Sequence, residues 1–282
     1  AAVTQEVARL YETYEFDDVA RLLYRFVWNE VCDWYLEIAK THLYSDDEAE
    51  RLQVSGNLLV LLEQVMVMLH PLMPFLTEEI YSYLPQVATG GRPASVFDAV
   101  YPQAEAEWAD PAAEAAMETF IAVCAGLRSA REELGLARDV VGKVTLVELE
   151  PGAASGLIGL APALRHLAGC DVEGVVQPSA EPAGRFASVP GPGVRALLDL
   201  TGLVDLDREK ERLVAKAKKA SVDVAKAGGK LANAGFLAKA PEAVVAEERE
   251  RLAAAEAVLD EVRRQYRERI GEEMPAFEKG GR

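Results

Sequence analysis

The segment Trp28–Glu37 (WNEVCDWYLE) brings together side chains that suit molecular recognition. Two Trp, one Tyr and one Cys lie there beside several polar residues, within about three helical turns. Aromatic and apolar faces stack on unpaired nucleic-acid bases, so one edge of this helix is a candidate base-contacting surface. The alternative is a core helix with a buried aromatic face, and we predict that situation for Trp28 and Trp34.

Positive charge is concentrated in one part of an otherwise acidic chain. The 282 residues carry a net charge of −16, which taken alone disfavours binding to nucleic acid. Residues 208–239 differ, because they hold 9 basic and 3 acidic residues, a net charge of +6. This run predicts a local phosphate-binding surface that includes Lys216, Lys218, Lys219 and Lys230. The alternative is an ordinary solvated helix surface.

The residues do not suggest a catalytic centre. Gly228–Gly229 is a lone pair within a helical pattern rather than a phosphate-binding loop, and no HExxH segment occurs. Cys32, Cys124 and Cys170 are far apart and form no CxxC pair, which predicts free thiols in a reducing compartment. The three His residues lack partners at metal-ligand spacing. We therefore predict no catalytic residues, no metal and no cofactor bound to this chain.

Hydrophobic periodicity predicts a helical bundle over residues 1–138. Val7, Leu10, Tyr11 and Tyr14 share one helical face, and Asp17 or Asp18 is expected to cap the next helix. Further helices are expected over about 49–70, from a cap at Thr77, and over about 111–134.

The remaining residues predict two different structures. Residues 139–202 read as a small α/β subdomain, with strands expected near 143–150, 171–177, 184–189 and 194–200 and a short helix at 156–167. Residues 203–282 contain two long helices, about 205–234 and 241–270, with narrow apolar stripes. They predict an antiparallel coiled-coil hairpin, with Asn233, Gly235 and Lys239 in its turn.

Four segments resemble one protein family. Residues 24–40 (YRFVWNEVCDWYLEIAK) resemble the anticodon-binding helix of valyl-tRNA synthetases, and residues 69–81 (LHPLMPFLTEEIY) resemble a motif shared with the isoleucyl and leucyl enzymes. Residues 128–136 (RSAREELGL) and 236–252 (FLAKAPEAVVAEERERL) are similar to valyl-type segments, the second from the C-terminal coiled coil. The resemblance covers nearly the whole chain in the correct order.

The resemblance implies that this chain is the C-terminal, tRNA-binding portion of a valine–tRNA ligase. Leu36 matches a position that packs on an anticodon base, and Asp33 and Lys40 are its expected helical neighbours, three residues before and four after. Lys226 and Arg251 match positions that touch the outer corner of the L-shaped tRNA, with Lys219 and Lys230 beside them. The family commonly has Arg at the first of these positions, whereas this chain has Lys226, and a lysine is a point charge that does not offer the bidentate or stacked contact of an arginine.

The HIGH and KMSKS signatures, which bind ATP in the parent enzyme, do not occur in the sequence, so we predict that the chain alone is inactive. The N-terminus has no Met and no signal-peptide pattern, and we found no apolar run approaching the ~20 residues of a membrane span. We expect a cytoplasmic monomer that is part of a longer protein and binds tRNA-Val. The alternatives are the equivalent region of an isoleucyl or leucyl enzyme, or a non-enzymatic coiled-coil adaptor.

Overall fold

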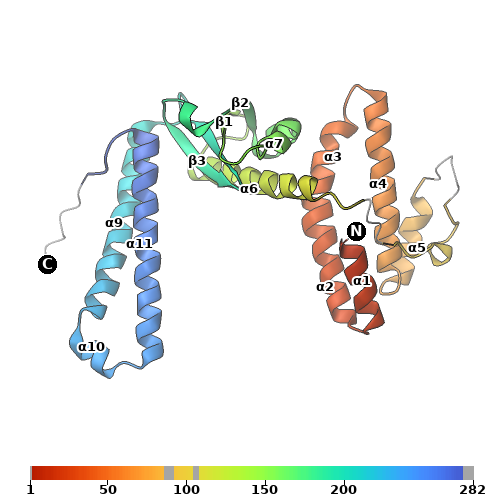
Figure 1. Ribbon diagram of the computed structural model, residues 1–282, viewed down its shortest axis with the longest axis horizontal. Coiled ribbons are helices and arrows are strands. Elements are labelled where there is room, and N and C mark those ends of the chain that lie inside the picture. Colours follow the sequence, from red (N-terminus) through yellow and green to blue (C-terminus); the bar gives the residue numbers. More distant parts are fainter. Residues whose placement is uncertain (1, 86–91, 104–107, 276–282) are drawn as a thin grey trace. The chain divides into compact units, whose positions relative to one another are not determined.

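A computed structural model describes residues 2–85, 92–103 and 108–275, and for Lys239 it describes the backbone alone. The chain forms two compact units, residues 1–115 and 116–282. Figure 1 labels most of the elements of both.

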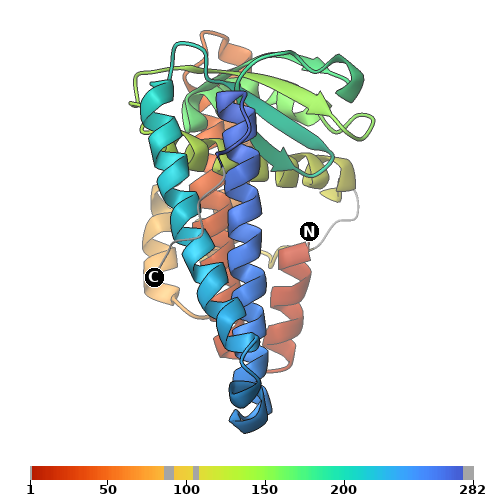
Figure 2. The ribbon, with the colours of Figure 1, turned by 90° about the vertical axis from the view of Figure 1, so that its left-hand side faces the viewer.

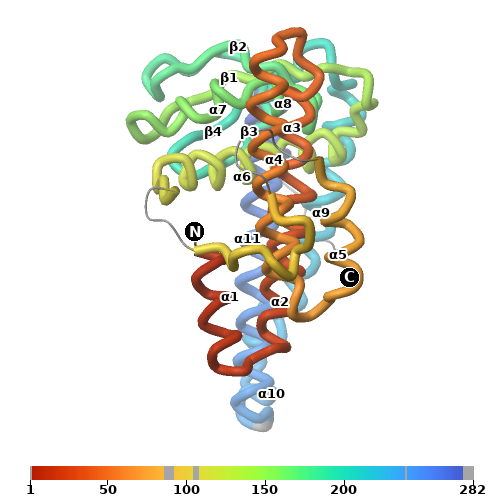
Figure 3. Tube along the Cα trace, turned by 90° about the vertical axis from the view of Figure 1, so that its right-hand side faces the viewer, coloured from red at the N-terminus to blue at the C-terminus, as the bar shows by residue number. Residues whose placement is uncertain are grey.

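The first unit is built from helices. Their bounds are α1 Ala2–Glu12, α2 Phe16–Arg25, the π-helix η1 Phe26–Tyr35, α3 Leu36–Leu43, α4 Glu48–Leu69, α5 Pro74–Tyr83 and the 3-10 turn η2 Val96–Asp98. Because α2, η1 and α3 follow one another without a break, residues 16–43 form one long helix that Figure 3 shows beside α4. The core of this unit combines α1, α2, α4 and α5 through Val7, Leu23, Val65, Met68 and Tyr81.

Two predicted helix caps and one predicted helical position are wrong in this unit. Neither Asp17 nor Asp18 caps α2, because both lie in its first turn and pair with Arg21. Thr77 lies inside α5, which starts at Pro74, and its hydroxyl bonds to the Met73 carbonyl. Tyr14 is outside α1, has a φ of 61°, and its side chain is exposed. Pro74 suits the first turn of α5, and the left-handed backbone of Tyr14 ends α1 before that residue.

Helix α4 corrects the expectation that no segment is apolar enough to cross a membrane. By length and composition alone it passes that test, with a mean hydropathy of 1.6, and 22% of the tested window is buried. Core helices of soluble proteins pass the same test, so this finding is weak evidence for a membrane segment.

The second unit contains most of α6 (Pro111–Glu133) and a four-stranded sheet with the order β2-β1-β4-β3. The strands are β1 Gly142–Glu148, β2 Cys170–Val176, β3 Phe186–Gly191 and β4 Val194–Asp199. Strands β1 and β2 are parallel, joined through α7 (Ser155–Gly159) and α8 (Ala161–Ala168), whereas β4 is antiparallel to β1 and β3. Gly126 of α6 lies against Val189, and Thr119 bonds to the Pro192 carbonyl, so α6 packs on the sheet.

The same unit ends in a hairpin of two long helices, which we call the arm. It consists of α9 (Leu206–Leu231), the short helix α10 (Ala234–Lys239) and α11 (Glu242–Ile270), and Figure 2 shows α9 and α11 side by side. Its seam buries Leu213, Ala217, Leu259, Val262 and Tyr266 near the base. The segment predicted as a turn contains α10, because the Asn233 side chain accepts bonds from the Gly235 and Phe236 amides and caps a helix there.

Candidate nucleic-acid interface

Leu36 lies where the π-helix η1 gives way to α3, and its side chain is half-buried. The expected helical relation to Asp33 does not hold, because Asp33 lies within η1. A π-helix bonds residue i to i+5 and therefore has a wider turn, so positions three apart no longer line up. Lys40 lies in α3 and keeps the α-helical spacing to Leu36, and its Nζ pairs with Glu37. Of the two predicted neighbours, only Lys40 shares the helical face of Leu36, and Glu37 partly neutralises the charge of Lys40.

Trp28 is 57% exposed, which contradicts its assignment to the core. Its ring stacks on that of Tyr24, with 6.3 Å between the ring centroids and 9° between the planes. The two rings border an apolar cleft of about 410 Å³ that also involves Leu72 and Met73. Trp34, by contrast, is half-buried. The sequence did not single out Tyr24 as a site residue, because it lies one helical turn before the aromatic segment 28–37.

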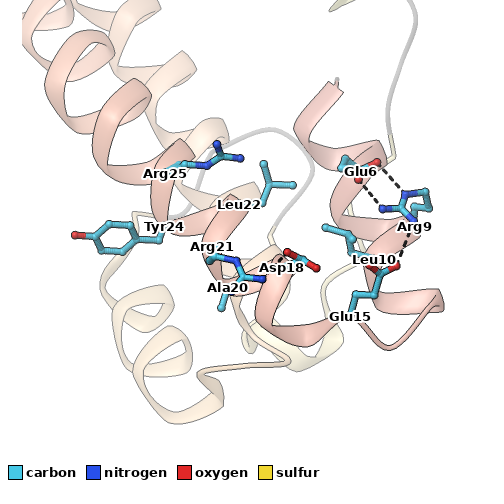
Figure 4. Close-up of a pocket in the computed structure, with 10 residues that line it drawn as sticks. All are labelled: Glu6, Arg9, Leu10, Glu15, Asp18, Ala20, Arg21, Leu22, Tyr24 and Arg25. Carbon is cyan, nitrogen blue, oxygen red and sulfur yellow. Dashed lines mark hydrogen bonds and ion pairs between the residues drawn. The ribbon is translucent and has the colours of Figure 1, made fainter. Parts of the chain in front are cut away.

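A second cleft, of about 720 Å³, lies between α1 and α2 and is drawn in Figure 4. Two of its arginines are paired within their own unit, Arg9 with Glu6 and Arg21 with Asp17 and Asp18. Arg25 also lines it, is exposed, and forms no ion pair with a described residue. Arg25 is therefore a cation in this acidic unit that remains available for a phosphate.

On the arm, Lys226 and Lys219 are exposed and form no ion pair with a described residue. They are seven residues apart on α9, which places them on one face, two turns from each other. Lys218 is exposed as well, whereas Lys216 pairs with Glu133 at 2.9 Å. The predicted cationic surface on α9 is therefore present, with Lys216 engaged elsewhere.

Glu248 modifies the prediction for the other two cations of the arm. This residue is 6% exposed, and its carboxylate accepts a bond from Lys230 Nζ at 3.1 Å. Arg251 lies 3.7 Å from the same carboxylate and also pairs with Glu247 at 2.7 Å. Lys230 and Arg251 thus approach the same carboxylate from the two helices of the arm, and Arg251 has Glu247 as a second partner. The sequence offered no signal for this, because Glu248 is one of many acidic residues in α11.

Among the described residues, no group of three or more His, Cys, Asp or Glu side chains is arranged so that it could hold a metal ion. His42 pairs with Glu50, and His70 bonds to Thr77. Cys124 and Cys170 are buried, and burial raises the pKa of both thiols, that of Cys124 to about 11. His42 and His70 are therefore engaged by neighbouring side chains, and the Cys124 and Cys170 thiols are buried.

Comparison with known protein families gives two matches. The family described as "Anticodon-binding domain of tRNA ligase" matches residues 1–146, and "Valyl tRNA synthetase tRNA binding arm" matches residues 205–269. The first match covers the helical unit with its two clefts. The second covers the arm and its exposed lysines.

Curated relatives point in the same direction. A valine–tRNA ligase of Desulfotalea psychrophila is 35% identical over 264 residues, covering 93% of this chain and 29% of that protein. One of Syntrophotalea carbinolica is 36% identical, with 91% and 28% covered, and one of Geobacter sulfurreducens is 37% identical, with 88% and 28% covered. The chain thus spans less than a third of the length of the relatives it matches.

Proposed function

Because this chain belongs to the family of tRNA-ligase anticodon-binding domains and carries the valyl-tRNA synthetase arm, we propose that it holds tRNA-Val at two places for a valine–tRNA ligase. The helical unit receives the anticodon loop, and the arm contacts the outer corner of the tRNA. In this proposal the three parts 1–138, 139–202 and 203–282 are the bundle, a connecting subdomain and the arm. The longer ligase activates valine with ATP and works as a cytoplasmic monomer.

The observation that carries the proposal is the set of exposed cations on α9. In a chain with a net charge of −16, Lys219 and Lys226 remain without an ion-pair partner among the described residues and share one helical face. A row of such lysines matches the spaced charges of a phosphate backbone, where shape and charge matter more than base identity. Lys230 and Arg251 join this surface when phosphate competes with Glu248 for them.

In the helical unit, Leu36 supplies an apolar face for an anticodon base, as unstacked loop bases require. Lys40 lies one helical turn after Leu36, so it can bind a phosphate next to the base that Leu36 contacts. Asp33 is the weaker candidate for an anticodon contact, because the π-helical turn separates it from the face of Leu36. The exposed Tyr24–Trp28 pair and Arg25 offer a further base-stacking surface and a further cation in this unit. The acidic remainder of the unit repels RNA outside the binding surface and so favours discrimination over affinity.

The test is equilibrium binding of the purified chain to tRNA-Val and to a panel of other tRNAs, by filter binding at several salt concentrations. About three to five phosphate contacts predict a slope of log affinity against log salt of about −2 to −4. A valyl specificity predicts tighter binding of tRNA-Val within the panel, and Leu36→Ala is expected to reduce that difference. Affinity that does not change with salt contradicts the proposal. Light scattering adds a check on the monomer, since an adaptor coiled coil dimerises.

A second assay concerns chemistry. The chain alone is expected to show no valine-dependent ATP–pyrophosphate exchange and no charging of tRNA, because the proposal assigns it binding only. Measurable exchange by the pure chain contradicts this part.

A further inference from the structure

The base of the arm contains five charged side chains from three helices. Glu133 is the last residue of α6, Glu209, Arg212 and Lys216 lie in the first turns of α9, and Arg269 lies in the last turn of α11. Arg269 donates one bond to Glu209 at 2.9 Å and another to Glu133 at 3.0 Å. We call these five residues the base cluster.

The other two cations complete the base cluster. Arg212 binds Glu209 through Nε and Nη2, at 2.7 and 2.8 Å, and reaches Glu133 at 3.3 Å. Lys216 donates to Glu133 at 2.9 Å. Each carboxylate therefore accepts bonds from at least two cations, and Glu133 accepts bonds from both long helices of the arm.

Burial makes these ion pairs sensitive to geometry. Arg269 and Glu209 are each 4% exposed, so neither charge can exchange its partner for water. A buried charge that loses its partner is strongly destabilising, and a planar guanidinium binds two carboxylates only in a narrow range of directions. A swing of the arm at its base would therefore break the bonds of buried Arg269, whereas water can reach the more exposed Arg212 and Lys216.

Apolar and backbone contacts also hold the arm, because α11 packs against strand β3 of the sheet. The apolar seam of Leu213, Leu259 and Tyr266 holds α9 against α11, but it lies within the arm. Beside the base cluster lies a cleft of about 470 Å³, and Glu133, Glu209 and Arg212 themselves line part of it. Glu133 belongs to α6, which packs on the sheet, and so it ties both arm helices to the sheet layer.

Small angles matter because the arm is long. Eighteen residues separate Arg269 from Arg251, which is about 27 Å of helix at 1.5 Å per residue. A swing of roughly 10° at the base would move Arg251 by about 5 Å, more than the length of an ion pair.

We propose that the base cluster positions the arm. Glu133, Glu209 and Arg269, with Arg212 and Lys216, hold the arm in one direction relative to the sheet, so that its cations meet the nucleic acid together. The positioning stands on the second unit alone, whereas its effect on RNA rests on the function proposed above.

The first experiment measures the direction of the arm without RNA. Spin labels are placed at Ala232→Cys, at the tip of the arm, and at Ser179→Cys, beside the sheet, with half-buried Cys32 replaced by Ser. Double electron–electron resonance then gives the distance distribution in the full chain. We expect one narrow distribution, which broadens or shifts in Glu133→Gln and in Arg269→Lys, where the charge stays but the planar fork is lost.

Lys210→Gln is the matched control, since it breaks the exposed pair with Glu272 at the same end of the arm. The control is expected to leave the distribution unchanged. Circular dichroism confirms that each variant is folded, and Arg269→Lys serves alone if Glu133→Gln does not fold. Distributions that stay identical in the folded variants overturn the proposal.

The second experiment measures tRNA affinity. Glu133→Gln removes a negative charge, so simple electrostatics predicts tighter binding, whereas loss of positioning predicts binding about 2- to 30-fold weaker. Equal or tighter binding by this variant overturns the link between arm direction and RNA. A failure of the parent chain to bind tRNA even at low salt contradicts the proposed function instead, and the distance measurements then still decide the positioning.

Discussion

Lys230 of α9 and Glu248 of α11 form an ion pair across the arm, with 3.1 Å between Nζ and Oε2. The same carboxylate lies 3.7 Å from Arg251, so one buried acid holds two of the predicted RNA-binding cations together. Glu248 therefore holds the two cations close together in the free protein, and its negative charge also weakens their attraction for phosphate.

Glu248→Gln is expected to strengthen tRNA binding and to weaken the arm. The isosteric amide keeps the shape but releases Lys230, while Arg251 keeps its pair with Glu247, so affinity at low salt rises and the salt dependence steepens. Loss of a buried charged acceptor costs about 1–3 kcal/mol of arm stability. Filter binding and thermal denaturation of the same preparations measure both effects. Glu256→Gln, an exposed acid further along α11, is the control for the change in net charge.

Lys226→Ala and Lys230→Ala are expected to differ although they are one helical turn apart. Lys226 has no ion-pair partner among the described residues, so its removal costs a phosphate contact and reduces the magnitude of the salt slope by about 1. Removal of Lys230 also leaves Glu248 with less compensation, so stability falls as well. Salt-titrated binding and thermal unfolding separate the two variants. The loss with Lys226→Ala should be similar for all tRNAs, and a loss confined to tRNA-Val would contradict a shape-reading arm.

The free energy of unfolding is expected to depend on pH through the Glu133 carboxyl. Burial would raise the pKa of its carboxyl, but the hydrogen bonds from Lys216 and Arg269 outweigh burial and lower it from 4.5 to about 2. A folded-state pKa below the unfolded value means stability that is complete above pH ~4.5 and is lost as the pH falls through about 2. The contribution is at most about 3 kcal/mol.

The measurement is urea denaturation of the parent chain and of Glu133→Gln at pH 7 and at pH 3. The parent should be more stable at pH 7, and the gap between the two proteins should narrow at pH 3. A gap of the same size at both pH values would show that the carboxylate titrates normally.

Gly229→Ala is expected to stabilise the arm. Gly229 lies inside α9, and a Cβ added there meets no atom within 4 Å. Alanine in a helix interior is favoured over glycine by about 0.5–1 kcal/mol, chiefly because the unfolded chain has less freedom to lose. Slower amide hydrogen exchange around residues 222–236 would report the gain. Unchanged or faster exchange would indicate that the arm requires the flexibility of glycine at this point.

The sequence by itself determined the kinds of structure and the family. Periodicities of 3.6 and 2 residues separated the helical region, the small α/β region and the two long helices, and those helices and strands are present within a few residues of the predicted bounds. The motif at 24–40 and the arm segment identified the valyl type. Such patterns are local, so they survive without knowledge of what packs against them.

Only the tertiary structure decided which of those side chains are available. Periodicity could not reveal the π-helical turn that separates Asp33 from Leu36, nor that Trp28 would be exposed beside Tyr24. It also could not tell Lys226, which has no described ion-pair partner, from Lys216 and Lys230, whose partners lie 83 and 18 residues away. A charge acts through its nearest neighbours in space, and contacts over such sequence distances are determined by how the helices pack.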